Sequence, residues 1–177
     1  MRRLVLFLAV LLSAVRISAA TVEYTFEIGV GCNVEDFGTL PDNKSGNVYF
    51  GQFDIMQGVT FDSTHAVTVG FTEWFRSSDL ISWGGVKLQY KGSTFKGRHN
   101  SVAAVGGITW SPKFSSRDRE DADWLLQLHG GYQWTYRVGA GVSLGAEAGM
   151  MYRVAPASRG DQRPYAGAYI KSVIIFE

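Results

Sequence analysis

The sequence predicts an all-β protein, an eight-stranded antiparallel up-and-down β-barrel. Eight segments alternate apolar with polar or small side chains at every second position, which is the period of a β-strand. The composition agrees, because Gly contributes 21 of the 177 residues, aromatic side chains 14% and Pro only four residues. Beyond residue 20 no segment approaches 18 consecutive apolar residues, so the sequence predicts no later bilayer-spanning helix.

The first 20 residues are predicted to be a signal peptide. Residues 1–3 (MRR) are positively charged, residues 4–15 are apolar, and residues 18–20 (SAA) supply the small side chains of a cleavage site. An uncleaved anchor is the alternative, but residues 4–15 are too short for a spanning helix, which needs about 20 residues. We therefore expect an exported protein whose barrel occupies residues 21–177.

Charge and cysteine content exclude two classes of protein. Arg2, Arg3 and Arg16 lie in the signal, so the 17 basic residues fall to 14 against 16 acidic ones in the mature chain. No basic surplus is left to neutralise the phosphates of a nucleic acid. Cys32 is the single cysteine, and a small scaffold held by internal disulfides is therefore excluded.

The strands follow one another with turn-rich segments between them. They are predicted at residues 22–31, 48–61, 66–76, 83–91, 102–110, 124–134, 138–152 and 165–176. The apolar face of the first four carries Val22, Tyr24, Phe26, Ile28 and Val30, then Phe53, Ile55, Val59 and Phe61, then Val67, Val69, Phe71 and Phe75, then Val86, Leu88 and Tyr90. That of the last four carries Val102, Ala104 and Ile108, then Leu126, Leu128 and Tyr132, then Val142, Leu144 and Ala146, then Ala166, Ala168, Ile170 and Ile174.

The connections predict one end with long loops and one with tight turns. Three polar segments, 32–47, 111–122 and 153–164, are expected as the long loops of one end. Tight turns are expected at 62–65 and 135–137 at the other end, where 92–101 is unusually long. The alternation changes phase near Gly51, which predicts a β-bulge there.

The polar face predicts which side of the barrel meets lipid. It combines many glycines with charges of both signs, as suits the narrow interior of an eight-stranded barrel. Its polar members are Glu23, Glu27, Asp54, Lys87, Gln89, His129, Glu147 and Lys171. The apolar face then meets hydrocarbon, and the barrel is a transmembrane β-barrel. The alternative is a soluble lipocalin-like carrier, with the faces reversed and an apolar ligand inside.

Aromatic side chains are predicted to form two belts at the membrane surfaces, where a ring can be apolar and its polar atom wet. The belt at the long-loop end is Trp110, Trp124, Tyr152 and Tyr165. The belt at the tight-turn end is Tyr90, Trp134 and Phe176, with Phe61 and Tyr136 beside it. Trp74 and Trp83 are out of phase with their apolar faces and are interpreted as lying beside a loop.

With its signal peptide, eight alternating strands and a last strand bearing Ile170, Ile174 and Phe176, the chain resembles the small eight-stranded outer-membrane barrels, the group of the OmpA membrane domain, OmpX and OmpW. The resemblance covers nearly all of residues 21–177 as a pattern. It implies a bacterial outer membrane and insertion by the barrel-assembly machinery. Family members end on the aromatic residue itself, whereas Glu177 follows Phe176 here.

The chemistry-bearing residues predict no enzyme, no cofactor and no metal site. His99 and Ser101 have the spacing of the His-x-Ser pair of lipid A deacylases on this architecture, but they fall in a predicted turn without an acidic partner. Three scattered histidines and one cysteine do not make a metal-binding pattern, and His129 is interpreted as a packed interior residue. Cys32 is interpreted as a small apolar filler.

The charges of the polar face are the candidate site. Buried charges are costly unless they are paired, so we expect an ionic network formed by Glu27, Asp54, Lys87, His129, Glu147 and Lys171. The predicted function is a monomeric barrel that supports envelope integrity or binds an extracellular partner through loops 32–47, 111–122 and 153–164. A narrow ion or small-solute channel, in which the ion pairs act as a gate, is the alternative.

Overall fold

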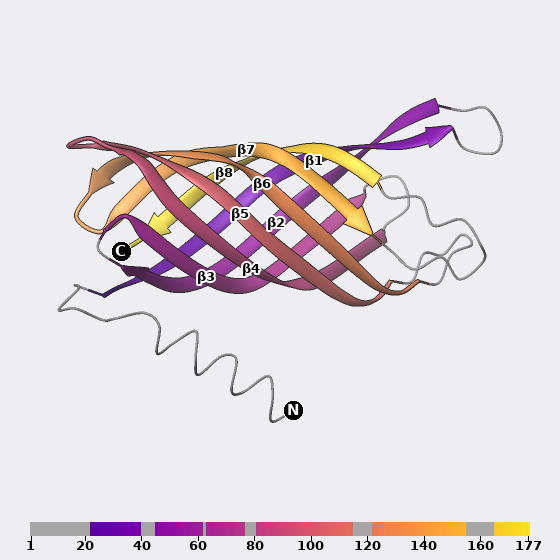
Figure 1. Cartoon of the computed structure of the whole chain (residues 1–177), viewed down its shortest axis with the longest axis horizontal. Coiled ribbons are helices and arrows are strands. Elements are labelled where there is room, and N and C mark those ends of the chain that lie inside the picture. The colour runs from indigo at the N-terminus through magenta and orange to yellow at the C-terminus, as the bar shows by residue number, and fades with distance from the viewer. Residues whose placement is uncertain (1–21, 40–44, 62, 77–80, 115–121, 155–164) are drawn as a thin grey trace, which may run out of the picture.

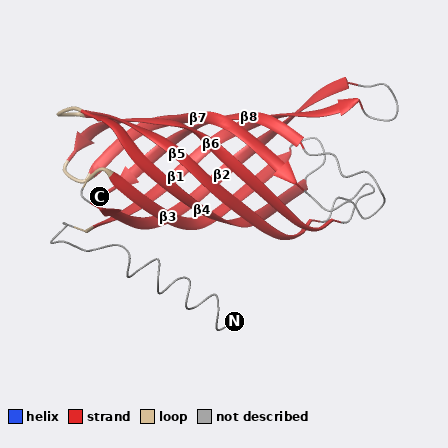
Figure 2. Ribbon diagram, viewed as in Figure 1, coloured by secondary structure: helices blue, strands red, loops and turns tan. Residues whose placement is uncertain are grey.

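A computed structural model describes residues 22–39, 45–61, 63–76, 81–114, 122–154 and 165–177; the side chains of 35–39, 45–48, 76, 81–83, 113–114, 122–123 and 165 lie outside this description. The predicted signal peptide also lies outside it. Every regular element in the described residues is a strand (Figure 2), and none of them forms a helix with the length and hydropathy of a membrane span.

Eight strands close into a barrel in which each strand pairs with its neighbours in the sequence, as Figure 1 shows. The strands are β1 (Glu23–Thr39), β2 (Ser45–Phe61), β3 (His65–Arg76), β4 (Ile81–Lys96), β5 (Asn100–Phe114), β6 (Ala122–Gly139), β7 (Val142–Val154) and β8 (Tyr165–Phe176). Antiparallel pairing of β1 with β8, from Phe26 opposite Phe176 to Asp36 opposite Ala166, completes the ring. The predicted all-β, eight-stranded antiparallel barrel is confirmed.

The faces are as predicted, with apolar side chains outside and charges inside. On β4, Leu88 is 48% exposed whereas its neighbour Lys87 is 2% exposed. On β8, Ile170 is 56% exposed and Lys171 is 2% exposed. Because side chains of successive residues leave a strand on opposite faces, these contrasts place the lysines in the interior and the aliphatic side chains on the outer wall.

The strands are longer than predicted at both ends of the barrel. Within the three predicted long loops, the structure continues β1 to Thr39, begins β2 at Ser45, continues β5 to Phe114 and continues β7 to Val154. Segments 40–44, 77–80, 115–121 and 155–164 remain between strands at what we call the loop end. The prediction of loops at these strand ends is wrong, because a strand can keep its paired backbone without an alternating apolar face.

The opposite end, which we call the turn end, has only short connections, at 62–64, 97–99 and 140–141. The prediction of a long turn over 92–101 is wrong, because β4 continues to Lys96 and accommodates an irregularity between Ser93 and Phe95. The turn predicted at 135–137 is also wrong. Those residues belong to β6, and the chain reverses at Ala140 and Gly141.

The bulge predicted at Gly51 is absent. Gly51 pairs in register with both Cys32 and Phe75, and Phe50 points inward with 5% of its surface exposed. A Cβ atom at residue 51 would lie 2.1 Å from the Phe75 ring, so this glycine leaves room for the ring on the outer wall. The apparent change of phase arises because the interior of the barrel also contains apolar side chains near its loop end.

Candidate functional site: the charged interior

Lys171 is the centre of a cluster of buried ion pairs. Its Nζ lies 3.0 Å from Asp54 Oδ2, 3.2 Å from Glu147 Oε2 and 3.6 Å from Glu27 Oε1. The three carboxylates come from β2, β7 and β1, and because β1 and β7 both pair with β8, these contacts join neighbouring strands from the two ends of the chain. All four side chains are 2% exposed or less, which makes the cluster fully interior.

Two further lysines complete the cluster. Lys87 Nζ lies 2.9 Å from Asp54 Oδ2, so that Asp54 is shared between Lys87 and Lys171. Lys91 is paired with Glu27 and also donates to Gln133 Oε1 over 3.1 Å. Three lysines thus face three carboxylates, and the cluster has no net charge. This balance matters because a buried charge without a counter-charge costs several kcal/mol.

Polar side chains also donate hydrogen bonds to Glu147 and Asp54. Gln89 Nε2 and Gln133 Nε2 each donate to Glu147 Oε2 over 3.1 Å. Gln52 donates to both oxygens of Asp54, and the Thr72 hydroxyl donates to one of them. These hydrogen bonds restrain carboxylates that would otherwise depend on lysine contacts alone.

Towards the loop end, a cationic and aromatic layer closes the interior. The Arg153 guanidinium lies 4.9 Å from the centre of the Trp74 ring and 5.8 Å from that of Phe50, and it donates to Gln127 Oε1 over 2.9 Å. Trp74 is completely buried. The interpretation of Trp74 as a loop-adjacent residue is therefore wrong. Its phase departs from the apolar face because it points into the barrel and stacks with an arginine.

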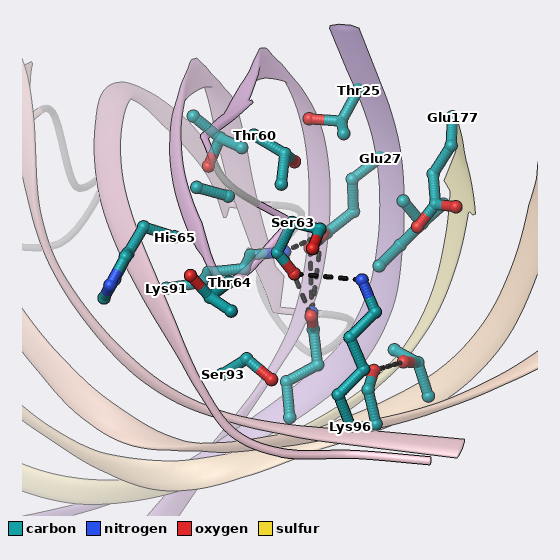
Figure 3. Close-up of a pocket in the computed structure, with 16 residues that line it drawn as sticks. Thr25, Glu27, Thr60, Ser63, Thr64, His65, Lys91, Ser93, Lys96 and Glu177 are labelled. Atoms are coloured by element: carbon teal, nitrogen blue, oxygen red, sulfur yellow. Dashed lines mark hydrogen bonds and ion pairs between the residues drawn. The ribbon is translucent and has the colours of Figure 1, made fainter. Parts of the chain in front are cut away.

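Towards the turn end, the interior opens into a polar cavity (Figure 3). The cavity has a volume of about 130 Å³, and Glu27, Lys91 and Gln133 are among its lining residues. Figure 3 labels Glu27 and Lys91 in this lining. A second cavity of about 180 Å³ adjoins it nearer the turns and shares Thr60, Ser63, Lys96, Ser101, Thr135 and Glu177 with it. The described side chains are thus buried in the middle of the interior, whereas the two cavities lie at its turn end.

The structure brings five of the six predicted network residues into direct contact; His129 is separate. Its ring lies against Tyr169 and over Gly107, where a Cβ atom would lie 2.5 Å from the imidazole. Among the described residues, neither ring nitrogen of His129 has a hydrogen-bond partner. Lys91, Gln133 and Arg153 also belong to the charged interior but are not among the predicted network residues. Lys91 lies four residues after Lys87, and Gln133 lies four residues after His129, so each shares an inward face with its predecessor. The period of two alone could therefore have placed both in the predicted network.

The other chemistry-bearing residues do not assemble a site. Ser101 Oγ lies 2.6 Å from Thr135 Oγ1 inside the barrel, whereas the His99 ring lies beside Tyr136 at a centroid distance of 6.1 Å. The two residues do not share a face because His99 precedes the first residue of β5. Within the described residues no group of His, Cys, Asp and Glu side chains could hold a metal ion. Cys32 is exposed on the outer face, so it is not a packing filler.

The residues of the two predicted belts are exposed on the outer wall wherever their side chains are described. Near the loop end these are Trp110, Trp124 and Tyr152, and near the turn end they are Tyr90, Trp134, Tyr136 and Phe176. The side chain of Tyr165 lies outside the described residues. The role of these rings at a membrane surface stays a prediction.

Comparison with known proteins identifies the fold. No protein-family model and no curated protein matches the chain. Among solved structures, Neisserial surface protein A superimposes with a TM-score of 0.63 and 10% identity, covering 88% of this chain and 97% of that one. The N-terminal β-barrel domain of Pseudomonas aeruginosa OprF gives a TM-score of 0.51 and 9% identity, covering 86% and 97%. The fold is that of the small eight-stranded outer-membrane barrels. At these identities the similarity establishes the fold alone.

Proposed function

We propose that the mature chain is a monomeric integral protein of the bacterial outer membrane, a filled barrel that acts through the segments at its loop end. The observation that carries the proposal is the separation of the two faces. Aliphatic side chains such as Leu88 and Ile170 surround the closed barrel on the outside, while the charges are inside and neutralise one another. This is the arrangement that hydrocarbon requires of a spanning sheet.

The interior supports this proposal over the soluble carrier. A lipocalin-like carrier needs an apolar cavity for its ligand, whereas the middle of this interior contains Lys171 and three carboxylates in contact. The two cavities at the turn end are small and lined mainly by polar side chains. An apolar ligand in such a space would separate these polar groups from water without replacing their hydrogen bonds.

Monomeric assembly by the barrel-assembly machinery is part of the proposal. Pairing of β1 with β8 uses both edge strands, so the sheet offers no free edge to a second copy. Ile170, Ile174 and Phe176 lie on the outer face of β8, where an assembly factor could contact them before closure. Segments 40–44, 115–121 and 155–164 would face the extracellular side and contact a surface partner or neighbouring envelope components. No catalytic role is included.

Cell fractionation tests the proposal. The protein should remain in the outer-membrane fraction after carbonate or high-salt washing and be released by detergent. Leu128→Arg, on the outer wall of β6 between Trp124 and Trp134, should lower the inserted amount, because a lipid-facing arginine costs roughly 2–4 kcal/mol at the midplane of the bilayer. Leu128→Met is the matched control and should insert like the unmodified protein. Release by carbonate, or equal insertion of both variants, would overturn the proposal.

A further inference from the structure

The cavity at the turn end is a hydroxyl-lined space that leads from the barrel mouth to the ion-pair cluster. Its lining includes eight Ser or Thr side chains: Thr25, Thr60, Ser63, Thr64, Thr68, Ser93, Ser101 and Thr135. Figure 3 shows Lys91 and Glu27 within this lining, joined to each other. Lys96, near the mouth, donates to the carbonyl oxygen of Ser63 over 3.1 Å.

Two of these hydroxyls are buried and lack a hydrogen-bond partner among the described residues. They are Thr25 Oγ1 and Thr68 Oγ1, on β1 and β3. A buried hydroxyl without a partner is unfavourable, and ordered water satisfies such groups where the space is polar and large enough. About 130 Å³ is room for several water molecules, since each occupies about 30 Å³ in the liquid.

The interior is closed beyond the ion pairs. Asp54, Lys87 and Lys171 lie next along the barrel and are 2% exposed or less. Arg153 stacked on Trp74 follows nearer the loop end. Thr109 is paired with Lys87 across β4 and β5 on this closed side, and it is completely buried. Like Thr25 and Thr68, it has a hydroxyl without a partner among the described residues, but it lines neither of the two cavities.

We propose that the barrel contains a half-channel: a hydrated cavity that admits water and small neutral hydrogen-bonding solutes from the turn end as far as Glu27 and Lys91. Neutral solutes are favoured because the walls present hydroxyls and the two charges at the inner end are paired with each other. That the cavity opens to the periplasm rests on the proposed function, which places the turn end on that side.

Cysteine labelling tests the half-channel. Thr25→Cys, Thr68→Cys and Thr109→Cys are made in a Cys32→Ala background, because Cys32 is exposed on the outer wall. The reagent is methyl methanethiosulfonate, which is small and neutral, applied to the folded protein in detergent. The cysteines at 25 and 68 should react at least roughly tenfold faster than the one at 109, whose reaction requires local opening of the barrel. All three should react equally in denaturant, which shows that the reagent itself does not discriminate.

The outcomes separate this proposal from the proposed function. Equal rates at all three folded positions, or slow reaction at 25 and 68, would overturn the half-channel. The measurement in detergent does not depend on the membrane in which the protein resides. A second measurement uses barrels reconstituted in one orientation and an uncharged methanethiosulfonate whose hydroxyl-rich group keeps it from crossing the bilayer. It should modify residue 25 from the turn end, and failure to react from that end would overturn the half-channel. Reaction from the loop end would overturn the half-channel even if fractionation had confirmed the outer-membrane location.

Discussion

Lys171 shows how one residue depends on its counter-charges inside the barrel. It contacts Asp54, Glu147 and Glu27, and together with Lys87 and Lys91 it balances these three carboxylates. The free-energy cost of removing each ion from water is offset by its contacts with the opposite charges, so the offset is lost when a partner is removed. The cluster is therefore expected to respond to substitution as a unit, and a change in one member alters the energy of the rest.

A double-mutant cycle tests this coupling. Glu147→Ala and Lys171→Ala should each lower the free energy of unfolding by about 3–5 kcal/mol, because each leaves an uncompensated buried charge. The double variant keeps two lysines and two carboxylates and should lose clearly less than the sum of the single losses. The measurement is urea unfolding in detergent, followed by tryptophan fluorescence.

The control pairs Glu147→Ala with Lys96→Ala. Lys96 is exposed at the turn end and makes no ion pair with Glu147, so these two losses should add. If the losses at Glu147 and Lys171 also add, their 3.2 Å contact contributes nothing to stability and the cluster is only a set of independent side chains.

At the scale of the elements, the hairpin between β6 and β7 depends on one backbone conformation. Gly141 has a φ of +73°, in the left-handed region that favours glycine, and its carbonyl accepts a hydrogen bond from the Glu177 amide over 2.9 Å. Gly139, two residues earlier, would present an added Cβ atom to open space. Gly141 therefore has a backbone conformation that favours glycine, whereas residue 139 has room for a side chain.

Substitution of the two glycines compares a strained position with an unstrained one in the same hairpin. Gly141→Ala should lower the free energy of unfolding by about 1–3 kcal/mol, because alanine is strained at positive φ. A Cβ atom there would also lie 2.8 Å from the Glu177 carbonyl oxygen. Gly139→Ala is the matched control and should be nearly neutral. Midpoints of urea unfolding check both, and an equal effect of the two alanines would show that φ at residue 141 does not limit the hairpin.

At the scale of the whole molecule, two successive barriers oppose a continuous pore. One is the neutral ion-pair cluster around Lys171, and the other is the layer of Arg153 with Trp74 and Phe50. Eight strands leave an interior only wide enough for side chains to fill, so the barriers follow from strand number as well as from sequence. The narrow-channel alternative would require both to open together.

Planar-bilayer recordings test this expectation. The purified protein should be silent or show rare small openings. Trp74→Ala should behave similarly, because the ion pairs still close the interior when the aromatic layer is weakened. Glu147→Ala, which unbalances the cluster, is the variant expected to raise the frequency of openings. Sustained large-conductance openings of the unmodified barrel would contradict a filled interior.

The sequence by itself determined the fold class and the two faces of the wall. Alternation along 22–31 and 142–152, with glycines opposite aliphatic side chains, required strands with one apolar face, and the confirmed barrel has these phases. Period two is a local property of the backbone, so it is visible without knowledge of the partner strands. Phe50 and Trp74 are apolar side chains that point into the interior. At these positions the same pattern led to wrong predictions, a bulge near Gly51 and a loop-adjacent Trp74.

Only the tertiary structure decided which charges meet and where the interior is hollow. Glu27 and Lys91 are 64 residues apart in the sequence, and their contact depends on closure of the ring and on the register of every strand between them. The cavity beside them likewise depends on side chains from both sides of the barrel. The alternation along a strand shows which side chains point into the barrel. Their position along the barrel axis and their neighbours depend on the register between strands and on closure of the ring, which are properties of the whole sheet.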